Sequence, residues 1–286
     1  MKLAILAAAA AGAALTGCAT VPAPDPGVPL TVHRNRLFLA AAVNGQPVGA
    51  LLDSGAEMTS IDDDRAASLG LALTGADEVK GSGGTAKVRF SQGVTVEAAG
   101  IRLADRMVAV FDLDEVASRL IGRPVPVIVG RELFDAARLR IDVEAGRIAS
   151  VPRDREPAGA RLPLTAHKGI EHFPVSLEGH PPASAAFDLG NGGTVLIGKA
   201  YAERLGLTAP GRIVGRRTGG GIGGAIERDL VILKTVTIAG RTFENVEAAI
   251  DPLESASDLN IGTQLLRRFL ITADYAQHVL WLEPRR

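Results

Sequence analysis

The chain has 286 residues, of which 47% are hydrophobic, so it is long enough for one large bilobal domain or two small ones. Its formal net charge of -1, without any long block of like charge, argues against partners such as nucleic acid that bind through a basic surface. Its 33 glycines and 16 prolines, with few aromatic residues, favour many short strands joined by tight turns.

Residues 1–17 are typical of a signal peptide, because a positive start at Lys2 precedes an apolar run over residues 3–15. That run is shorter than the roughly 20 residues that a membrane-spanning helix needs. The sequence Leu15-Thr16-Gly17-Cys18 resembles the bacterial lipobox, which implies cleavage before Cys18 and lipidation of this residue. Several acyl chains together give stable anchoring. The resemblance therefore implies a lipid-anchored protein of the bacterial envelope that faces the periplasm, and the non-acidic Ala19 favours the outer membrane.

Two linkers divide the mature chain. Residues 18–30 are rich in proline, which favours an extended spacer between the membrane and the folded body. Residues 153–162 are polar and contain proline and glycine. We therefore expect one lobe at residues 31–152 and a second at residues 163–286. Cys18 is the only cysteine, so no disulfide can form within the chain.

The two expected lobes repeat each other. Residues 50–62 read A-L-L-D-S-G-A-E-M-T-S-I-D, and residues 185–197 read A-A-F-D-L-G-N-G-G-T-V-L-I. A short amphipathic helix follows each segment and ends at a glycine, Gly70 or Gly206. This pattern indicates an internal duplication.

The later segments of each half also match. A glycine cluster comes next, then alternating strands, then an apolar run that ends at Gly130 or Gly262, and finally a hairpin. The interval from Gly130 to Asp142 equals that from Gly262 to Asp274. Short strands with frequent turns and no long helix predict an all-β barrel or sandwich in each half.

Asp53 and Asp188 each follow an apolar strand and precede a tight turn. Two such loops that face each other bring two carboxylates to about 3 Å, where they share one proton. One carboxylate can then act as general base on a water molecule, and the protonated one can polarise a carbonyl group. The pair would titrate as a unit.

The D-S-G-A sequence at residues 53–56, together with the later apolar-apolar-glycine segment, resembles the retropepsin-like aspartic proteases. The resemblance covers both halves, and it implies two β-barrel lobes in a single-chain, pepsin-like arrangement. It also implies catalysis by Asp53 and Asp188, a peptide or protein substrate bound as an added strand, a monomer, and neither metal nor cofactor. The loop residues that support the two aspartates would be Ser54, Gly55, Ala56, Leu189, Gly190 and Asn191. Flaps over the substrate would consist of Gly81, Ser82, Gly83 and Gly84 in the first half and of Gly219, Gly220, Gly221, Gly223 and Gly224 in the second.

The second loop departs from the family pattern, since Leu189 stands where a hydroxyl residue is expected and Asn191 stands where a small one is expected. In the family the two hydroxyl residues brace the paired loops. We therefore expect a buried Ser54 to lose its partner, and Asn191 to act as a donor to Asp188. This departure keeps two alternatives open. One is a catalytically impaired module that binds peptides or proteins with a protease fold, and the other is a first lobe that pairs with a second chain.

Other chemistries have less support in the sequence. Gly219, Gly221 and Gly224 fit G-x-G-x-x-G, but a strand-like segment follows instead of the helix that a dinucleotide site requires. The five histidines are scattered and do not form H-E-x-x-H, and no G-x-S-x-G sequence occurs.

Overall fold

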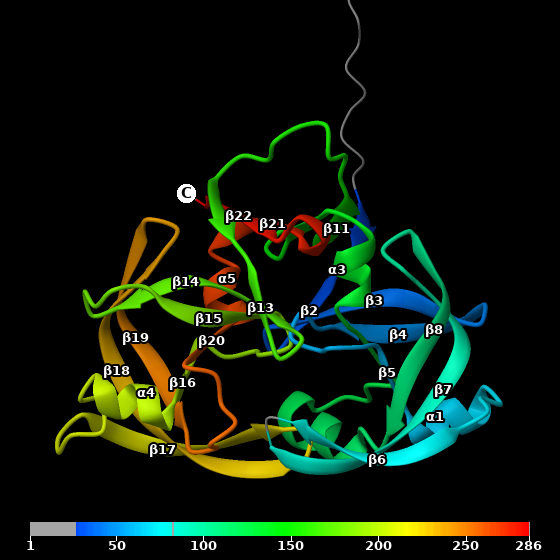
Figure 1. The fold of residues 1–286 in the computed structure, drawn as a ribbon, viewed down its shortest axis with the longest axis horizontal. Helices are drawn as coiled ribbons and strands as arrows, with labels where there is room; N and C mark the ends of the chain where they lie inside the picture. The colour runs from blue at the N-terminus through cyan, green and yellow to red at the C-terminus, as the bar shows by residue number, and fades with distance from the viewer. Residues whose placement is uncertain (1–26, 82, 286) are drawn as a thin grey trace, which may run out of the picture.

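A computed structural model describes residues 27–81 and 83–285 (Figure 1). The predicted signal peptide, the lipidation residue Cys18, most of the first linker and the flap residue Ser82 lie outside the described residues. Within the described ranges, no helix is both long and apolar enough to cross a membrane.

Each lobe is built on one eight-stranded sheet that closes on itself through an extra pairing, β3 with β7 in the first lobe and β14 with β18 in the second. The strand orders are β2-β3-β4-β9-β5-β8-β7-β6 and β13-β14-β15-β20-β16-β19-β18-β17, so every strand of one lobe has an equivalent in the other. The prediction of a mostly β protein with two equivalent lobes is confirmed.

The first lobe contains these elements: β2 (Thr31–His33), β3 (Arg36–Val43), β4 (Gln46–Leu52), β5 (Ser60–Asp62), α1 (Asp63–Ser68), β6 (Thr74–Gly81), β7 (Gly84–Ala98), β8 (Ile101–Phe111), α2 (Asp114–Val116), the π-helical turn η1 (Ala117–Ile121), β9 (Val127–Val129) and α3 (Glu132–Ala136). The second lobe contains β13 (Thr165–His167), β14 (Ile170–Leu177), β15 (Ala183–Asp188), β16 (Val195–Gly198), α4 (Lys199–Arg204), β17 (Ile213–Gly221), β18 (Gly224–Ile238), β19 (Arg241–Asp251), β20 (Leu259–Gly262) and α5 (Thr263–Leu266).

The turns show why the repeated sequence gives a repeated fold. Ala99-Gly100 joins β7 to β8, and Ala239-Gly240 joins β18 to β19, with positive φ at all four residues. A two-residue hairpin turn of this hand matches the right-handed twist of the strands that it joins. Equivalent turns therefore fix the same hairpin register in both lobes.

A six-stranded sheet joins the lobes in the order β1-β11-β10-β21-β22-β12. Its elements are β1 (Val28–Pro29), β10 (Leu139–Asp142), β11 (Arg147–Ser150), β12 (Ala160–Pro163), β21 (Phe269–Asp274), the 3-10 turn η2 (Tyr275–Gln277) and β22 (Val279–Pro284). The central pair consists of β10 from the first half and β21 from the second, in antiparallel register. In Figure 1 this sheet lies above and between the two lobes.

One apolar core runs through both lobes and the joining sheet. It includes fully buried side chains such as Leu52 and Ile61 in the first lobe, Phe187 and Ile261 in the second, and Ile271 in the joining sheet. Burial of each such side chain contributes roughly 1.5–3 kcal/mol relative to exposure. The core holds the ends of β4 and β15 in place, and these two ends carry the aspartate loops.

Candidate active site

The structure brings Asp53 and Asp188 together between the lobes. Each follows a strand with a parallel partner, since β4 pairs with β9 and β15 pairs with β20. A Cβ atom at Gly190 would lie 2.3 Å from Cγ of Asp53, and one at Gly55 would lie 3.0 Å from Cγ of Asp188. Each loop glycine therefore leaves the space that the carboxyl group of the other lobe occupies. Both aspartate side chains remain partly exposed, so water can reach the pair.

The two carboxyl groups have unequal hydrogen-bond partners. Oδ1 of Asp53 accepts the backbone N–H of Gly55 over 2.8 Å. Oδ1 of Asp188 accepts the equivalent backbone N–H of Asn191 over 2.9 Å, and its Oδ2 also accepts from Nδ2 of Asn260 over 2.6 Å. Asp188 therefore accepts hydrogen bonds on both of its carboxyl oxygens, and one of them comes from a side-chain amide.

The surroundings of Asp53 raise its pKa. Burial in the site, followed by the negative charge of Asp188, raises the pKa of Asp53 to about 7, and hydrogen bonding to Asp188 acts in the same direction. The backbone N–H of Gly55 and the guanidinium of Arg36 oppose this rise in pKa. Asp53 is therefore the carboxyl group that keeps its proton up to about pH 7.

Ser54 corrects one expectation from the sequence. Its buried hydroxyl donates to the backbone carbonyl of Phe187 over 2.8 Å and accepts the backbone N–H of Leu189 over 2.9 Å. The expectation that Ser54 loses its partner was wrong, because the partners are backbone groups on either side of Asp188 and do not depend on the side chain at Leu189.

Two further residues complete this brace. The Thr263 hydroxyl donates to the carbonyl of Leu189 over 2.9 Å, and the Tyr275 hydroxyl donates to the carbonyl of Ser54 over 3.1 Å. The buried Tyr275 ring stacks on Phe134 at a centroid distance of 4.9 Å. The second lobe thus supports both loops without a hydroxyl at position 189.

Asn191 is a donor to Asp188, as expected, but through its backbone N–H. Its side-chain amide donates to Oδ1 of Asn260 over 2.8 Å. Asn260 then donates to Asp188, so the two amides form a relay to one carboxylate oxygen. Sequence reasoning missed Asn260 because it grouped this residue with an apolar run. The available signal was a polar residue at the position that Ile128 occupies in the first half.

The two glycine-rich hairpins meet tip to tip, as the strand ends at the bottom of Figure 1 show. The first is the β6–β7 hairpin and the second is the β17–β18 hairpin. The Gly83 N–H donates to the carbonyl of Ile222 over 2.9 Å, and a Cβ atom at Gly83 would lie 2.2 Å from the carbonyl oxygen of Gly224. Glycine at the tips therefore permits the backbones of the two flaps to touch.

Arg119, which sequence reasoning did not identify, holds the second flap. It lies on η1, in the connection at residues 112–126 whose second-lobe equivalent is the shorter connection at residues 252–258. Its guanidinium donates to the carbonyls of Gly219, Gly221 and Gly224 over 2.7, 3.1 and 3.0 Å. Glu115 pairs with the same guanidinium. No local pattern predicts contacts with backbone carbonyls so far along the chain.

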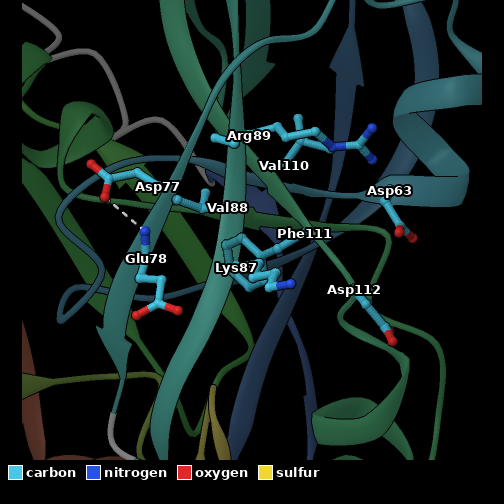
Figure 2. A pocket seen from close by; sticks show the side chains of 10 residues that line it. Asp63, Asp77, Glu78, Lys87, Val88, Arg89, Val110, Phe111 and Asp112 are labelled. Atoms are coloured by element: carbon cyan, nitrogen blue, oxygen red, sulfur yellow. Dashed lines mark hydrogen bonds between the residues drawn. The ribbon is translucent and has the colours of Figure 1, made fainter.

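A pocket of about 620 Å³ opens elsewhere on the first lobe, and neither Asp53 nor Asp188 lines it. Figure 2 shows its residues on the flap strands and β8, with Asp63 and Asp112 at one side. Its walls carry acidic and basic side chains together. Across the part of the chain that the structure describes, no group of three or more His, Cys, Asp or Glu residues is arranged to hold a metal ion.

Comparison with known protein families gives one match. The model of the family described as aspartyl protease matches residues 39–133 and again residues 173–265. The two segments cover most of the chain, and each includes one of the two aspartate loops. A search of curated proteins found no match.

Proposed function

We propose, because this chain belongs to the aspartyl protease family, that it is an endopeptidase in which Asp53 and Asp188 together activate one water molecule. The observation that carries this proposal is the pairing of the two carboxyl groups from equivalent loops, with the pKa of Asp53 raised to about 7. A proton shared between two acids is what general acid–base hydrolysis by such a pair needs.

The hydrogen bonds support a division of roles. Ionised Asp188, with donors on both oxygens, takes a proton from the water as its oxygen attacks the scissile carbonyl carbon. Protonated Asp53 gives its proton to the carbonyl oxygen, which forms a neutral tetrahedral diol. The diol then collapses as Asp188 passes its proton to the leaving nitrogen and Asp53 recovers its own. The carbon–nitrogen bond breaks and the original protonation state of the pair returns.

The flaps support an extended peptide as the substrate. Their glycine-rich tips present backbone groups toward one another, and backbone groups can pair with a peptide irrespective of its side chains. The contact between Gly83 and Ile222 must open to admit a peptide, and closure would then exclude bulk water.

Membrane attachment is a further part of this proposal. Its support is the lipobox-like sequence that ends at Cys18 after an apolar run of signal-peptide length. Mass spectrometry of the N-terminal peptide from the membrane fraction should show an acylated Cys18. A Cys18→Ser variant should appear in the soluble fraction, and an unmodified N-terminal peptide in the parent protein would contradict attachment.

Cleavage of a mixed peptide library, followed by mass spectrometry, tests the catalytic role. We expect the Asp53→Asn and Asp188→Asn variants to lose cleavage, while Asp105→Asn, a change at an exposed residue of β8, keeps it. Equal cleavage by all the proteins, or none by any, would remove the proposal. Binding of peptides without cleavage would instead favour a binding module, and activity that follows a dimer in gel filtration would favour a pairing of first lobes.

A further inference from the structure

The two lobes have matching strand registers. Each residue near Asp53 therefore has an equivalent residue near Asp188. In the first lobe Phe38 lies opposite Leu51, two residues before Asp53, and Leu51 lies opposite Ile128. These three side chains are buried in an apolar cluster that we call the lobe-1 wall. Its other fully apolar members on the sheet are Val88, Ala109 and Phe111.

The equivalent positions of the second lobe carry polar groups. His172 lies opposite Ala186, two residues before Asp188, and Ala186 lies opposite Asn260. The positions that match Val88 and Phe111 hold Arg228 and Asp251, because the neighbouring pairs Arg89–Val110 and Asp229–Ile250 have the same register. We call His172, Arg228, Asp251 and Asn260 the lobe-2 wall.

The groups of the lobe-2 wall form a hydrogen-bonded, charge-balanced set. Arg228 and Asp251, both about 95% buried, are joined by a bond of 2.6 Å between Nη2 and Oδ2. Nε2 of His172 lies 3.2 Å from the hydroxyl of Ser257. Burial lowers the pKa of His172, so this ring is neutral at pH 7. The lobe-2 wall is therefore polar but has no net charge.

The same contrast continues among the half-buried residues around the two walls. Half-buried apolar side chains pack against the lobe-1 wall, namely Ala56, Met58, Val79, Leu120 and Ile222. Loop contacts show that Asn191 and Gly193 match Ala56 and Met58, because Gly262 faces the first pair as Gly130 faces the second. The flap registers match Val79 with Gly219. Large apolar groups on one side are thus replaced by small or polar ones on the other.

These two surroundings select different substrate side chains. A large apolar side chain against the lobe-1 wall loses contact with water and meets apolar atoms. The amides of Asn191 and Asn260 each have more donors and lone pairs than the bonds to each other, Gly193 and Asp188 use. The same apolar side chain against the lobe-2 wall would cover this remaining capacity without a hydrogen bond in return, which is unfavourable. A site built to hydrogen-bond a substrate discriminates strongly against an analogue that lacks the bonding group.

We propose that the protein is specific for a peptide bond that joins a large apolar residue, held by the first lobe, to an uncharged residue with an amide or hydroxyl side chain, held by the second. This inference rests on the proposed function and adds the substrate class to it. The uncharged character follows from the Arg228–Asp251 pair, which leaves neither sign of charge in excess.

A panel of otherwise identical peptides tests the inference on the unmodified protein. The two residues at the scissile bond are Leu-Leu, Leu-Gln, Gln-Leu or Gln-Gln, and kcat/KM is measured for each. We expect kcat/KM for one of the two mixed peptides, Leu-Gln or Gln-Leu, to exceed kcat/KM for each of the other three peptides by about tenfold or more. Replacement of Gln by Glu or Lys in the better peptide should remove the advantage. A highest kcat/KM for Leu-Leu would overturn the inference.

Non-cleavable versions of the four peptides, with a reduced scissile bond, separate this inference from the catalytic proposal. Their Kd values, measured by calorimetry, should follow the same order as kcat/KM. Selective binding of one mixed peptide without cleavage of its parent would defeat the catalytic proposal alone. The opposite result is cleavage that requires Asp53 while the Leu-Leu peptide binds as tightly as the mixed peptides or more tightly. That result would defeat the proposed substrate class and leave the catalytic proposal standing.

Exchange of wall residues between lobes gives the second test. The double variant Arg228→Val with Asp251→Phe carries the lobe-1 residues at these positions, and the preference for the mixed peptide should fall by about tenfold. The matched control changes Arg216 and Asp229 to Val, since this ion pair lies on the same hairpin with Arg216 exposed and Asp229 partly exposed, and the preference of this variant should stay unchanged. If the first double variant does not fold, as circular dichroism would show, His172→Phe replaces it. An unchanged preference in a folded wall variant contradicts the inference.

Discussion

The hydroxyl of Ser54 accepts the backbone N–H of Leu189 over 2.9 Å while it donates to the carbonyl of Phe187. One side chain from the first lobe therefore holds both sides of the second aspartate loop. The geometry does not need a second hydroxyl residue, because Thr263 and Tyr275 satisfy the carbonyls of Leu189 and Ser54.

Ser54→Ala should lower both stability and activity. The change leaves a buried N–H at Leu189 and a buried carbonyl at Phe187 without this partner, which we expect to cost about 2 kcal/mol in the free energy of unfolding. Urea denaturation measures this loss. Ser68→Ala, at an exposed position on α1, is the control and should change stability by less than about 0.5 kcal/mol. Equal stability of the two variants would show that the brace contributes nothing.

Asp53→Asn should stabilise the protein, and more so at higher pH. The pKa of Asp53 is about 7 in the folded protein and near 3.8 in the unfolded chain. Between these values the folded state holds a proton that the unfolded state has released, so the free energy of unfolding falls as pH rises from about 4 to about 7. A neutral asparagine removes this loss. We expect its Tm to exceed that of the parent by about 3 °C or more at pH 8 and by much less at pH 4.

Thermal unfolding at the two pH values, with Asp105→Asn as the control, measures this difference. If the Tm of Asp53→Asn lies below the parent value at pH 8, ionisation of Asp53 does not lower the free energy of unfolding of the parent protein. The assignment of the shared proton to Asp53 would then be wrong.

Much of this site could be predicted from the repeat alone. The two D-x-G loops, the glycine-rich hairpins and the closing hairpins each occur twice, and their matched order fixed the two lobes. Catalysis itself stays a prediction. The boundaries of the linkers also stay untested, although β1 and part of β12 fall within them.

The rest depends on contacts that no local pattern encodes. Asp142 and Asp274 occupy equivalent positions in the repeat. This equivalence does not reveal that their strands, β10 and β21, pair with each other across the lobes. Tyr275 occupies the position of Val143 in the repeat, yet its hydroxyl reaches the carbonyl of Ser54. Such differences between the halves become interpretable once the strand registers are known, because the registers identify the equivalent residue in the other half.

Arg36→Gln should move the alkaline limit of activity to higher pH. The positive charge of Arg36 lowers the pKa of Asp53, and activity ends when Asp53 loses its proton, so removal of the charge delays that loss. Glutamine keeps a side-chain N–H that can donate to the carbonyl of Gly190, which Nε of Arg36 does in the parent. The measurement is kcat/KM against pH, with Arg34→Gln as the control at an exposed position. The difference should shrink in high salt, and a shift to lower pH would contradict the assignment.

Arg119→Ala should release the second flap. Its guanidinium donates to three carbonyls at the flap tip, and hydrogen bonds from a charged donor contribute roughly 1.5–3 kcal/mol each before exposure reduces them. We expect amide hydrogen exchange at residues 219–226 to become about tenfold faster or more, which corresponds to about 1.4 kcal/mol. Arg216→Ala is the matched control, because this arginine pairs with Asp229 on the same hairpin while exposed to solvent. If amide exchange is equally fast in both variants, the second flap is held by the pairing of β17 with β18 and by the Gly83–Ile222 hydrogen bond. Arg119 would then have no part in closing the site.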